Sequence, residues 1–211
     1  MNIIAHRGIW DSQVKRNSLH ALTSSFDLDI GVETDIRDCD GILVISHDPP
    51  RAVDSLELDL LFRSYVERPS RPVLALNIKS DGLYEPLLSL LKRYGIENYF
   101  VFDMSVPDTL GYQRLQMPFA ARISEYESQN LLADAAKWIW LDAFHEEWFT
   151  TDTIKFWLDR GKCVAVVSPE LHQRPHKALW SKLLPIQTED RLYLCTDYVQ
   201  NAQEYFNVSK N

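Results

Sequence analysis

Short apolar runs alternate with segments of helical periodicity along the chain. Residues 2–5 predict a buried strand, and Asn17-Ser18 then predicts a helix N-cap before an apolar helical face that begins at Leu19. Gly31 opens the next strand, so the first unit is strand, helix, strand. That order is typical of parallel sheets, whose strands need a crossover connection.

The same alternation continues through the rest of the sequence. Continuous apolar runs, of the kind buried in parallel sheets, predict strands at residues 42–45, 72–78, 99–102, 119–123, 138–141, 163–167 and 192–195. Helical periodicity predicts helices at residues 56–65, 83–94, 106–115, 129–135, 151–160, 175–184 and 201–207. Gly95 and Gly161 follow two of these helices, at the position where a glycine commonly ends a helix.

Eight strand–helix repeats favour an α/β fold of the closed (β/α)8 type, a TIM barrel, over an open doubly wound sheet. At 211 residues the barrel is small, and the length suits a single domain over residues 1–211. Nearly every predicted strand ends in a charged or polar residue. Since the C-terminal ends of barrel strands meet at one mouth, these residues are expected to share a site.

The composition narrows the function. The formal net charge of −8 argues against a nucleic-acid or anionic membrane surface, because neither attracts an acidic protein. No apolar stretch is long enough for a signal peptide or a membrane span. The three cysteines lack CxxC spacing and predict buried thiols in a reducing compartment, so we expect a cytoplasmic protein with a small-molecule substrate.

The segment 31–48 carries the clearest chemistry. Glu33 and Asp35 lie two apart on a predicted strand, so both carboxylates point to one side, while Val32, Thr34 and Ile36 take the other. A second short strand follows and ends directly in Ser46-His47-Asp48. Carboxylates and an imidazole at strand ends indicate a site.

His6 ends the first strand as His47 ends its own, and imidazole suits acid–base chemistry near neutral pH. Glu33 and Asp35 are hard oxygen donors of the type that Mg²⁺ or Ca²⁺ requires. Arg7 and Lys79 either form salt bridges with these carboxylates or complete a site for a divalent cation and a phosphate. The combination with two histidines favours the second interpretation.

Further polar residues follow the later strands. Arg122 and Glu125 belong to the run RISEYE, which either lines a pocket or forms a solvated loop. Three more candidate pocket residues follow predicted strands: Asp142, Glu170 and His172. The sequence contains no glycine-rich nucleotide loop, no HExxH and no GxSxG, so it does not support nucleotide-binding, zincin or α/β-hydrolase chemistry.

Several of these motifs together resemble the glycerophosphodiester phosphodiesterases. The resemblance is carried by IAHRG at residues 4–8, Asn17 at a helix start, GVETDIRDCDGILVISHD at 31–48, Asn77-Ile78-Lys79, and CTDY at 195–198. It covers the first 80 residues well and the last strand weakly. The resemblance implies a TIM barrel that hydrolyses a phosphodiester with a divalent cation.

By position, the resemblance makes His6 and His47 the acid–base pair, Arg7 and Lys79 the phosphate contacts, and Glu33 and Asp35 two metal ligands. The family's third ligand is usually a glutamate two residues before the lysine, and here Asn77 stands there with a neutral carbonyl oxygen. Arg16 replaces the acidic residue that usually precedes the asparagine. Two alternatives therefore stay open: a phospholipase- or lyase-type diesterase acting on a lipid or polysaccharide headgroup, and a catalytically weakened phosphate-binding barrel.

Overall fold

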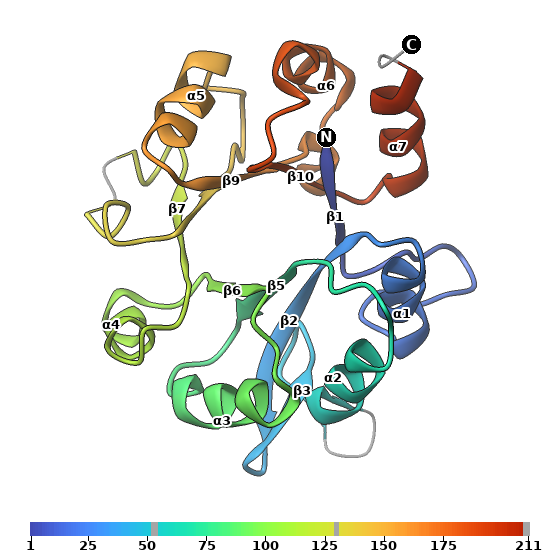
Figure 1. The fold of residues 1–211 in the computed structure, drawn as a ribbon, viewed down its shortest axis with the longest axis vertical. Helices are drawn as coiled ribbons and strands as arrows, with labels where there is room; N and C mark the ends of the chain where they lie inside the picture. The colour runs from blue at the N-terminus through green and yellow to red at the C-terminus, as the bar shows by residue number, and fades with distance from the viewer. Residues whose placement is uncertain (52–54, 129–130, 209–211) are drawn as a thin grey trace. The chain divides into compact units, whose positions relative to one another are not determined.

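The computed structural model describes residues 1–51, 55–128 and 131–208, and its contacts divide the chain into two compact units (Figure 1). The N-terminal unit is His6–Phe119, and the C-terminal unit joins Met1–Ala5 to Ala120–Asn211. Each unit combines parallel strands with helices, which confirms the predicted α/β class. The single domain over residues 1–211 stays a prediction.

Strand β2 (Gly31–Cys39) is the centre of the N-terminal unit. It runs parallel to β5 (Leu74–Ile78), with Asp35 opposite Asn77, and β5 runs parallel to β6 (Tyr99–Phe102). On its other edge β2 pairs antiparallel with β3 (Ile42–Ile45), which pairs antiparallel with β4 (Leu56–Glu57). The first six residues of β2 are buried, whereas its end, which pairs with β3, is partly exposed.

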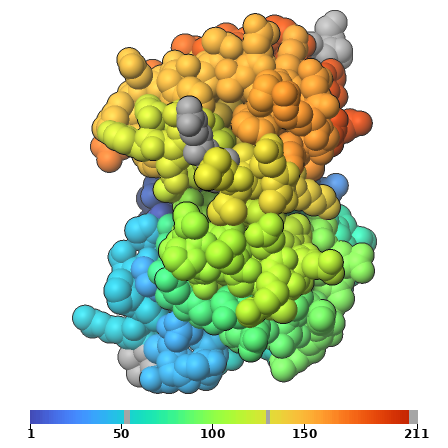
Figure 2. All heavy atoms as spheres, turned by 90° about the vertical axis from the view of Figure 1, so that its left-hand side faces the viewer, coloured from blue at the N-terminus to red at the C-terminus, as the bar shows by residue number. Residues whose placement is uncertain are grey.

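Four helices accompany these strands: α1 (Leu19–Asp27), α2 (Leu58–Val66), α3 (Tyr84–Tyr94) and α4 (Val106–Arg114). Ser18 is the N-cap of α1, because its hydroxyl accepts a hydrogen bond of 3.2 Å from the Ala21 N–H. Gly95 ends α3 in the left-handed conformation, as the sequence predicts. Helix α4 is less enclosed, and its segment of the chain lies on the face shown in Figure 2. Its Val106 and Leu110 side chains are exposed.

The C-terminal unit has a five-stranded parallel sheet in the order β1, β10, β9, β8, β7. The strands are β1 (Asn2–His6), β7 (Ala120–Ile123), β8 (Trp138–Leu141), β9 (Cys163–Val167) and β10 (Leu192–Thr196). The helices are α5 (Thr151–Asp159), α6 (Lys177–Leu183), α7 (Val199–Val208) and two 3-10 turns, η1 (Pro169–His172) and η2 (Leu184–Ile186). Helices α5, α6 and α7 lie on one side of the strands of this unit (Figure 1).

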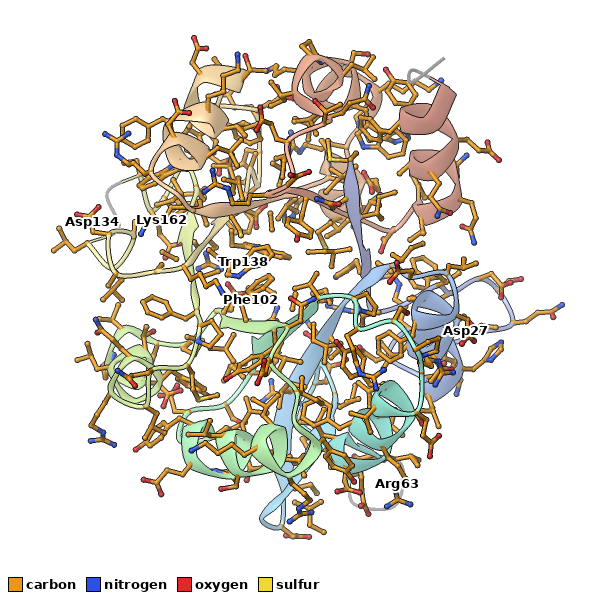
Figure 3. The ribbon with its side chains drawn as sticks, viewed as in Figure 1. Asp27, Arg63, Phe102, Asp134, Trp138 and Lys162 are labelled. Atoms are coloured by element: carbon orange, nitrogen blue, oxygen red, sulfur yellow. The ribbon has the colours of Figure 1, made fainter. Side chains whose placement is uncertain are left out.

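The structure departs from the sequence prediction at one helix and several ends. The helix predicted at residues 129–135 is wrong over 131–135, which form a turn; 129 and 130 lie outside the described residues. Lys162 points toward this turn (Figure 3) and donates hydrogen bonds of 2.6 and 2.7 Å to the carbonyls of Asp134 and Ala136. These bonds hold the carbonyls in a turn rather than a helix.

Smaller differences have local causes. Helix α2 begins two residues later than predicted because Leu56 and Glu57 pair with β3 as β4. Of the three free cysteines only Cys195 is buried, while Cys39 and Cys163 are partly exposed, contrary to expectation. Among the described residues, no helix has the length and apolar character needed to cross a membrane.

Candidate active site

Glu33 and Asp35 are the two most deeply buried acids of the N-terminal unit. Their side chains are 1% and 0% exposed, and their alternation along β2 puts both on one face. Buried carboxylates are rare unless they are paired with cations or bind a metal. Both carboxylates therefore need such partners.

Asp35 is paired twice. The Arg7 Nε atom lies 3.0 Å from Asp35 Oδ2, and the Lys79 Nζ atom lies 3.3 Å from Asp35 Oδ1. The salt bridges that the sequence offered as one of two interpretations are thus present. The two cations keep about a fifth of their side-chain surface exposed, at 19% and 20%, so they face solvent as well as Asp35. They can bind a substrate anion without leaving the carboxylate.

The negative charge of Glu33 is less well compensated by nearby cations than that of Asp35. Its Oε2 atom accepts a hydrogen bond of 3.2 Å from the Arg7 N–H and lies 3.8 Å from His6 Nε2. Burial, and secondly the charge of Asp35, raise the pKa of Glu33 to about 7, although His6, Arg7 and Lys79 act in the opposite direction. A further positive charge at this position would favour the ionised carboxylate.

Asn17 belongs to this site, although its position before a helix predicts a cap. Its amide nitrogen donates to Asp35 Oδ2 at 2.8 Å, and its amide oxygen accepts from the Thr34 hydroxyl at 2.8 Å. Asn17 has a φ of 58°, a left-handed conformation that asparagine tolerates better than most residues. Thr34 therefore contributes a polar contact to the site.

The position after His6 and Arg7 requires a glycine. Its φ is +83°, and a Cβ atom there would lie 2.5 Å from the backbone carbon of Ala21 in α1. Only glycine allows this close approach of the loop to the helix. The approach fixes Arg7, whose N–H also donates to the Glu33 carbonyl at 3.0 Å.

His47 opens onto a cavity of about 600 Å³, which Arg7 and Asn17 also line. Its Nδ1 atom lies 2.9 Å from Asp48 Oδ1, and its side chain is 48% exposed. The Ser46 N–H donates to the Asp35 carbonyl at 3.0 Å, so the end of β3 is tied to the strand that carries the acids. The structure thus brings His47, Arg7 and Asp35 into one region.

The oxygens around Asp35 fit a hard divalent cation. Within the described ranges no three His, Cys, Asp or Glu side chains group as a metal site. The candidate oxygens here come from two carboxylates, Glu33 and Asp35, and one amide, Asn77. Asn77 is 7% exposed, and its Oδ1 atom is buried without a hydrogen bond. A buried oxygen acceptor next to Asp35 in the sheet register, together with Glu33, supplies the all-oxygen ligands that Mg²⁺ and Ca²⁺ prefer.

The five further candidates, Arg122, Glu125, Asp142, Glu170 and His172, all lie in the C-terminal unit and bind partners there. Arg122 pairs with Glu127. Glu125 accepts from the Phe144 and His145 N–H groups at 3.1 and 2.8 Å. Burial raises the pKa of Glu125, but these backbone hydrogen bonds outweigh it and lower the pKa overall. Glu125 therefore shapes the loop after β8.

Asp142, Glu170 and His172 connect strand ends of the same unit. His172 Nε2 lies 2.7 Å from Asp142 Oδ1. Glu170 accepts hydrogen bonds from the Ser168 and Thr196 hydroxyls and from the Asp197 N–H. These contacts give all three residues a structural role, and a pocket role for them stays a prediction.

No family model and no curated protein sequence matches the chain. Solved structures do match it. A candidate glycerophosphodiester phosphodiesterase from Galdieria sulphuraria superposes with a TM-score of 0.76 at 19% identity, over 100% of this chain and 98% of that one. The chain therefore shares the fold of this structure.

Two further structures agree with this likeness. The glycerophosphodiester phosphodiesterase from Agrobacterium tumefaciens has a TM-score of 0.70 at 16% identity, over 99% of both chains. A phosphodiesterase from Oleispira antarctica, solved with its product sn-glycerol-3-phosphate, has a TM-score of 0.71 at 17% identity, over 98% of this chain and 97% of that one. The likeness confirms the predicted fold class, that of the (β/α)8 barrel.

Proposed function

We propose that the chain is a divalent-cation-dependent phosphodiesterase that hydrolyses a glycerophosphodiester to glycerol 3-phosphate and an alcohol. The observation that carries the proposal is the fully buried Asp35, held between Arg7, Lys79 and Asn17 beside Glu33. The fold it shares with phosphodiesterases, one of them solved with sn-glycerol-3-phosphate, supports the same substrate class.

Each residue has a defined task in this proposal. Arg7 and Lys79 bind the phosphate oxygens, and their pairing with Asp35 fixes both cations before the substrate arrives. His6 and His47 act as general base and general acid. One removes the proton of the attacking oxygen, and the other protonates the leaving alkoxide as its bond to phosphorus breaks. Because Asp48 contacts the Nδ1 atom of His47, the Nε2 atom remains available for proton transfer.

Glu33, Asp35 and Asn77 would hold the divalent cation. Bound there, the cation supplies positive charge that stabilises the negative charge developing on the phosphate oxygens. Asn77 contributes no charge of its own, so we expect weaker cation binding than three carboxylates would give. Calorimetric titration with Mg²⁺ and with Ca²⁺ measures this independently of turnover, and Asp35→Asn is expected to abolish the binding signal.

Turnover is tested on a panel of glycerophosphodiesters by the release of glycerol 3-phosphate. His6→Ala and His47→Ala are each expected to lower kcat by at least roughly 100-fold, the usual contribution of a general acid or base. His20→Ala is the matched control, because His20 is exposed on α1. Unchanged turnover in either of the first two variants contradicts the mechanism.

The neutral Asn77 favours one second candidate, a barrel that binds phosphodiesters without hydrolysing them. Saturable binding of a glycerophosphodiester without product release would establish that function. A lyase-type activity, in which a neighbouring substrate hydroxyl attacks the phosphorus and the alcohol leaves, would instead yield a cyclic phosphate product. The cytoplasmic location, the specific metal and the exclusion of nucleic acid stay predictions.

A further inference from the structure

A second cavity of the N-terminal unit lies where the start of α3 meets α4, and its volume is about 490 Å³. Two acids line it: Asp108 in the first turn of α4, and Asp81 in the connection between β5 and α3. Pro107 and Leu110 supply apolar wall. The volume is that of a small-molecule site, and the proposed hydrolysis makes no use of these residues.

Asp108 is buried and only half satisfied. Its side chain is 7% exposed, and its Oδ1 atom accepts a hydrogen bond of 2.9 Å from the Gly82 N–H. Its Oδ2 atom is buried without any hydrogen bond. Burial above all, and to a smaller extent the charge of Asp81, raise the pKa of Asp108. A donor at Oδ2 would remove the free-energy cost of this unsatisfied oxygen.

Tyr112 provides a second unsatisfied atom, one turn further along α4. Its side chain is 0% exposed, and its hydroxyl is buried without a hydrogen bond. Burial, and after it the charges of Asp108 and Asp81, raise the pKa of Tyr112, so the hydroxyl lies within reach of both charges. Buried polar atoms nearly always have a partner. Two such atoms on one helix face indicate that they share one.

The charge of the two acids is not neutralised by ion pairs. In the part of the chain that the structure describes, neither Asp81 nor Asp108 has an ion-pair partner. Both Asp81 oxygens lie 3.1 Å from Ser105 Oγ, whose single proton can satisfy only one of them at a time. Arg114 also lines the cavity, but its guanidinium carbon lies 5.7 Å from the centroid of the Tyr84 ring. The partner that these acids lack is a cation that donates hydrogen bonds.

A primary ammonium group matches these acceptors. It carries three N–H donors and no acceptor, as the lysine side chain does, and Asp81, Asp108 and the Tyr112 oxygen are three acceptors. A divalent metal fits less well, because within the described ranges no third His, Cys, Asp or Glu joins the two acids. A quaternary ammonium has no N–H and would leave Asp108 Oδ2 and Tyr112 unsatisfied.

We propose that this cavity binds the ammonium group of a small primary amine. Asp81 and Asp108 accept two of its N–H groups, the Tyr112 oxygen accepts the third, and the hydrocarbon part lies along Pro107 and Leu110. The inference goes beyond the proposed phosphodiesterase function and does not depend on it. Among the described residues, this cavity and the one at His47 have no lining residue in common.

The test is an NMR titration of the ¹⁵N-labelled full chain in EDTA at constant ionic strength. The probes are n-butylammonium chloride and butyltrimethylammonium chloride, which carry the same charge and differ in their N–H donors. The reporter is the Gly82 amide, because its N–H donates to Asp108. The variants are Asp108→Asn and Tyr112→Phe. Asp152→Asn is the matched control, since Asp152 lies in the first turn of α5.

Butylammonium is expected to shift the Gly82 signal saturably and to bind at least roughly tenfold more tightly than butyltrimethylammonium, because only the former makes charge-assisted hydrogen bonds. Asp108→Asn should lose the saturable shift, Tyr112→Phe should weaken binding several-fold, and the control should behave as the wild type. The same spectra show whether each variant is folded, and if Asp108→Asn is not, Tyr112→Phe decides.

Four results would overturn the inference. Equal affinity for the two probes means that only the net charge is recognised. Binding that survives in Asp108→Asn places the amine elsewhere. The absence of a saturable shift in the wild type means that water alone fills the space. A Gly82 shift caused by Ca²⁺ without EDTA, and lost in Asp108→Asn, assigns the acids to a metal instead.

Discussion

The pairing of Asp35 makes a quantitative prediction for stability in the absence of metal. Asp35→Asn removes one buried charge and leaves Arg7 and Lys79 without their carboxylate. At separations of 3.0 and 3.3 Å, each attraction is roughly 5 kcal/mol at an effective dielectric constant of about 20. Desolvation and the partial exposure of both cations offset much of this, so we expect a net loss of about 3 kcal/mol.

Glu33→Gln provides the matched control. The two acids lie on the same face of β2 and are equally buried, but Glu33 has a pKa of about 7 and is largely uncompensated. A neutral amide of the same shape keeps the hydrogen bond from the Arg7 N–H. We therefore expect Glu33→Gln to change stability by less than about 1 kcal/mol near pH 7, where half of the carboxyl is already neutral.

Thermal unfolding in EDTA measures both variants. For a chain of this size, a loss of 3 kcal/mol lowers Tm by roughly 6–12 °C, whereas the control should stay within a few degrees of the wild type. If Asp35→Asn unfolds at the wild-type temperature, or if Glu33→Gln is the more damaging change, the assignment of the ion pairs is wrong.

Three further predictions concern the N-terminal unit. Gly8→Ala puts a Cβ atom 2.5 Å from the Ala21 backbone at a positive φ, so it should destabilise the protein by more than about 2 kcal/mol and reduce phosphate binding through Arg7; wild-type stability would contradict the close approach. Gly111→Ala should also destabilise the protein, because Tyr84 ring atoms lie 2.6 Å from the added Cβ. In a Tyr84→Ala background the same change should instead stabilise the protein by up to about 1 kcal/mol, since alanine favours a helix more than glycine does. A double-mutant cycle in urea checks this change of sign. Burial raises the pKa of Asp108 against the effect of its hydrogen bond from Gly82, so the contribution of Asp108 to stability is greatest when it is protonated at low pH and is lost as pH rises through that pKa. Asp108→Asn should remove this loss and be more stable than the wild type at neutral pH; parallel Tm–pH curves for the two proteins would refute it.

The sequence predicts most of this fold because the relevant signals are local. Apolar runs such as β5 and β6 are buried on both faces, and Ser18 and Gly95 cap helices in the way their side chains or φ angles allow. The helix at residues 131–135 fails because its carbonyls bind Lys162, which is 28 residues beyond Asp134 in the chain. A pattern within one segment carries no information about such a distant donor.

The candidate site is predictable only in part for the same reason. Strand periodicity places Glu33 and Asp35 together, and strand ends place Arg7 and Lys79 near them. Asn17 resembles a cap in the sequence, and only the fold shows its amide against Asp35. Its signal is the adjacent Ser18, which caps the helix itself and leaves Asn17 available for another role.

The most direct test of the central claim follows a glycerophosphodiester by phosphorus NMR with metal-stripped protein. Addition of Mg²⁺ or Ca²⁺ should convert the diester signal into the monoester signal of glycerol 3-phosphate, and Asp35→Asn should prevent the conversion at any cation concentration. A diester signal that persists with the wild type under both cations, across the substrate panel, would contradict the account.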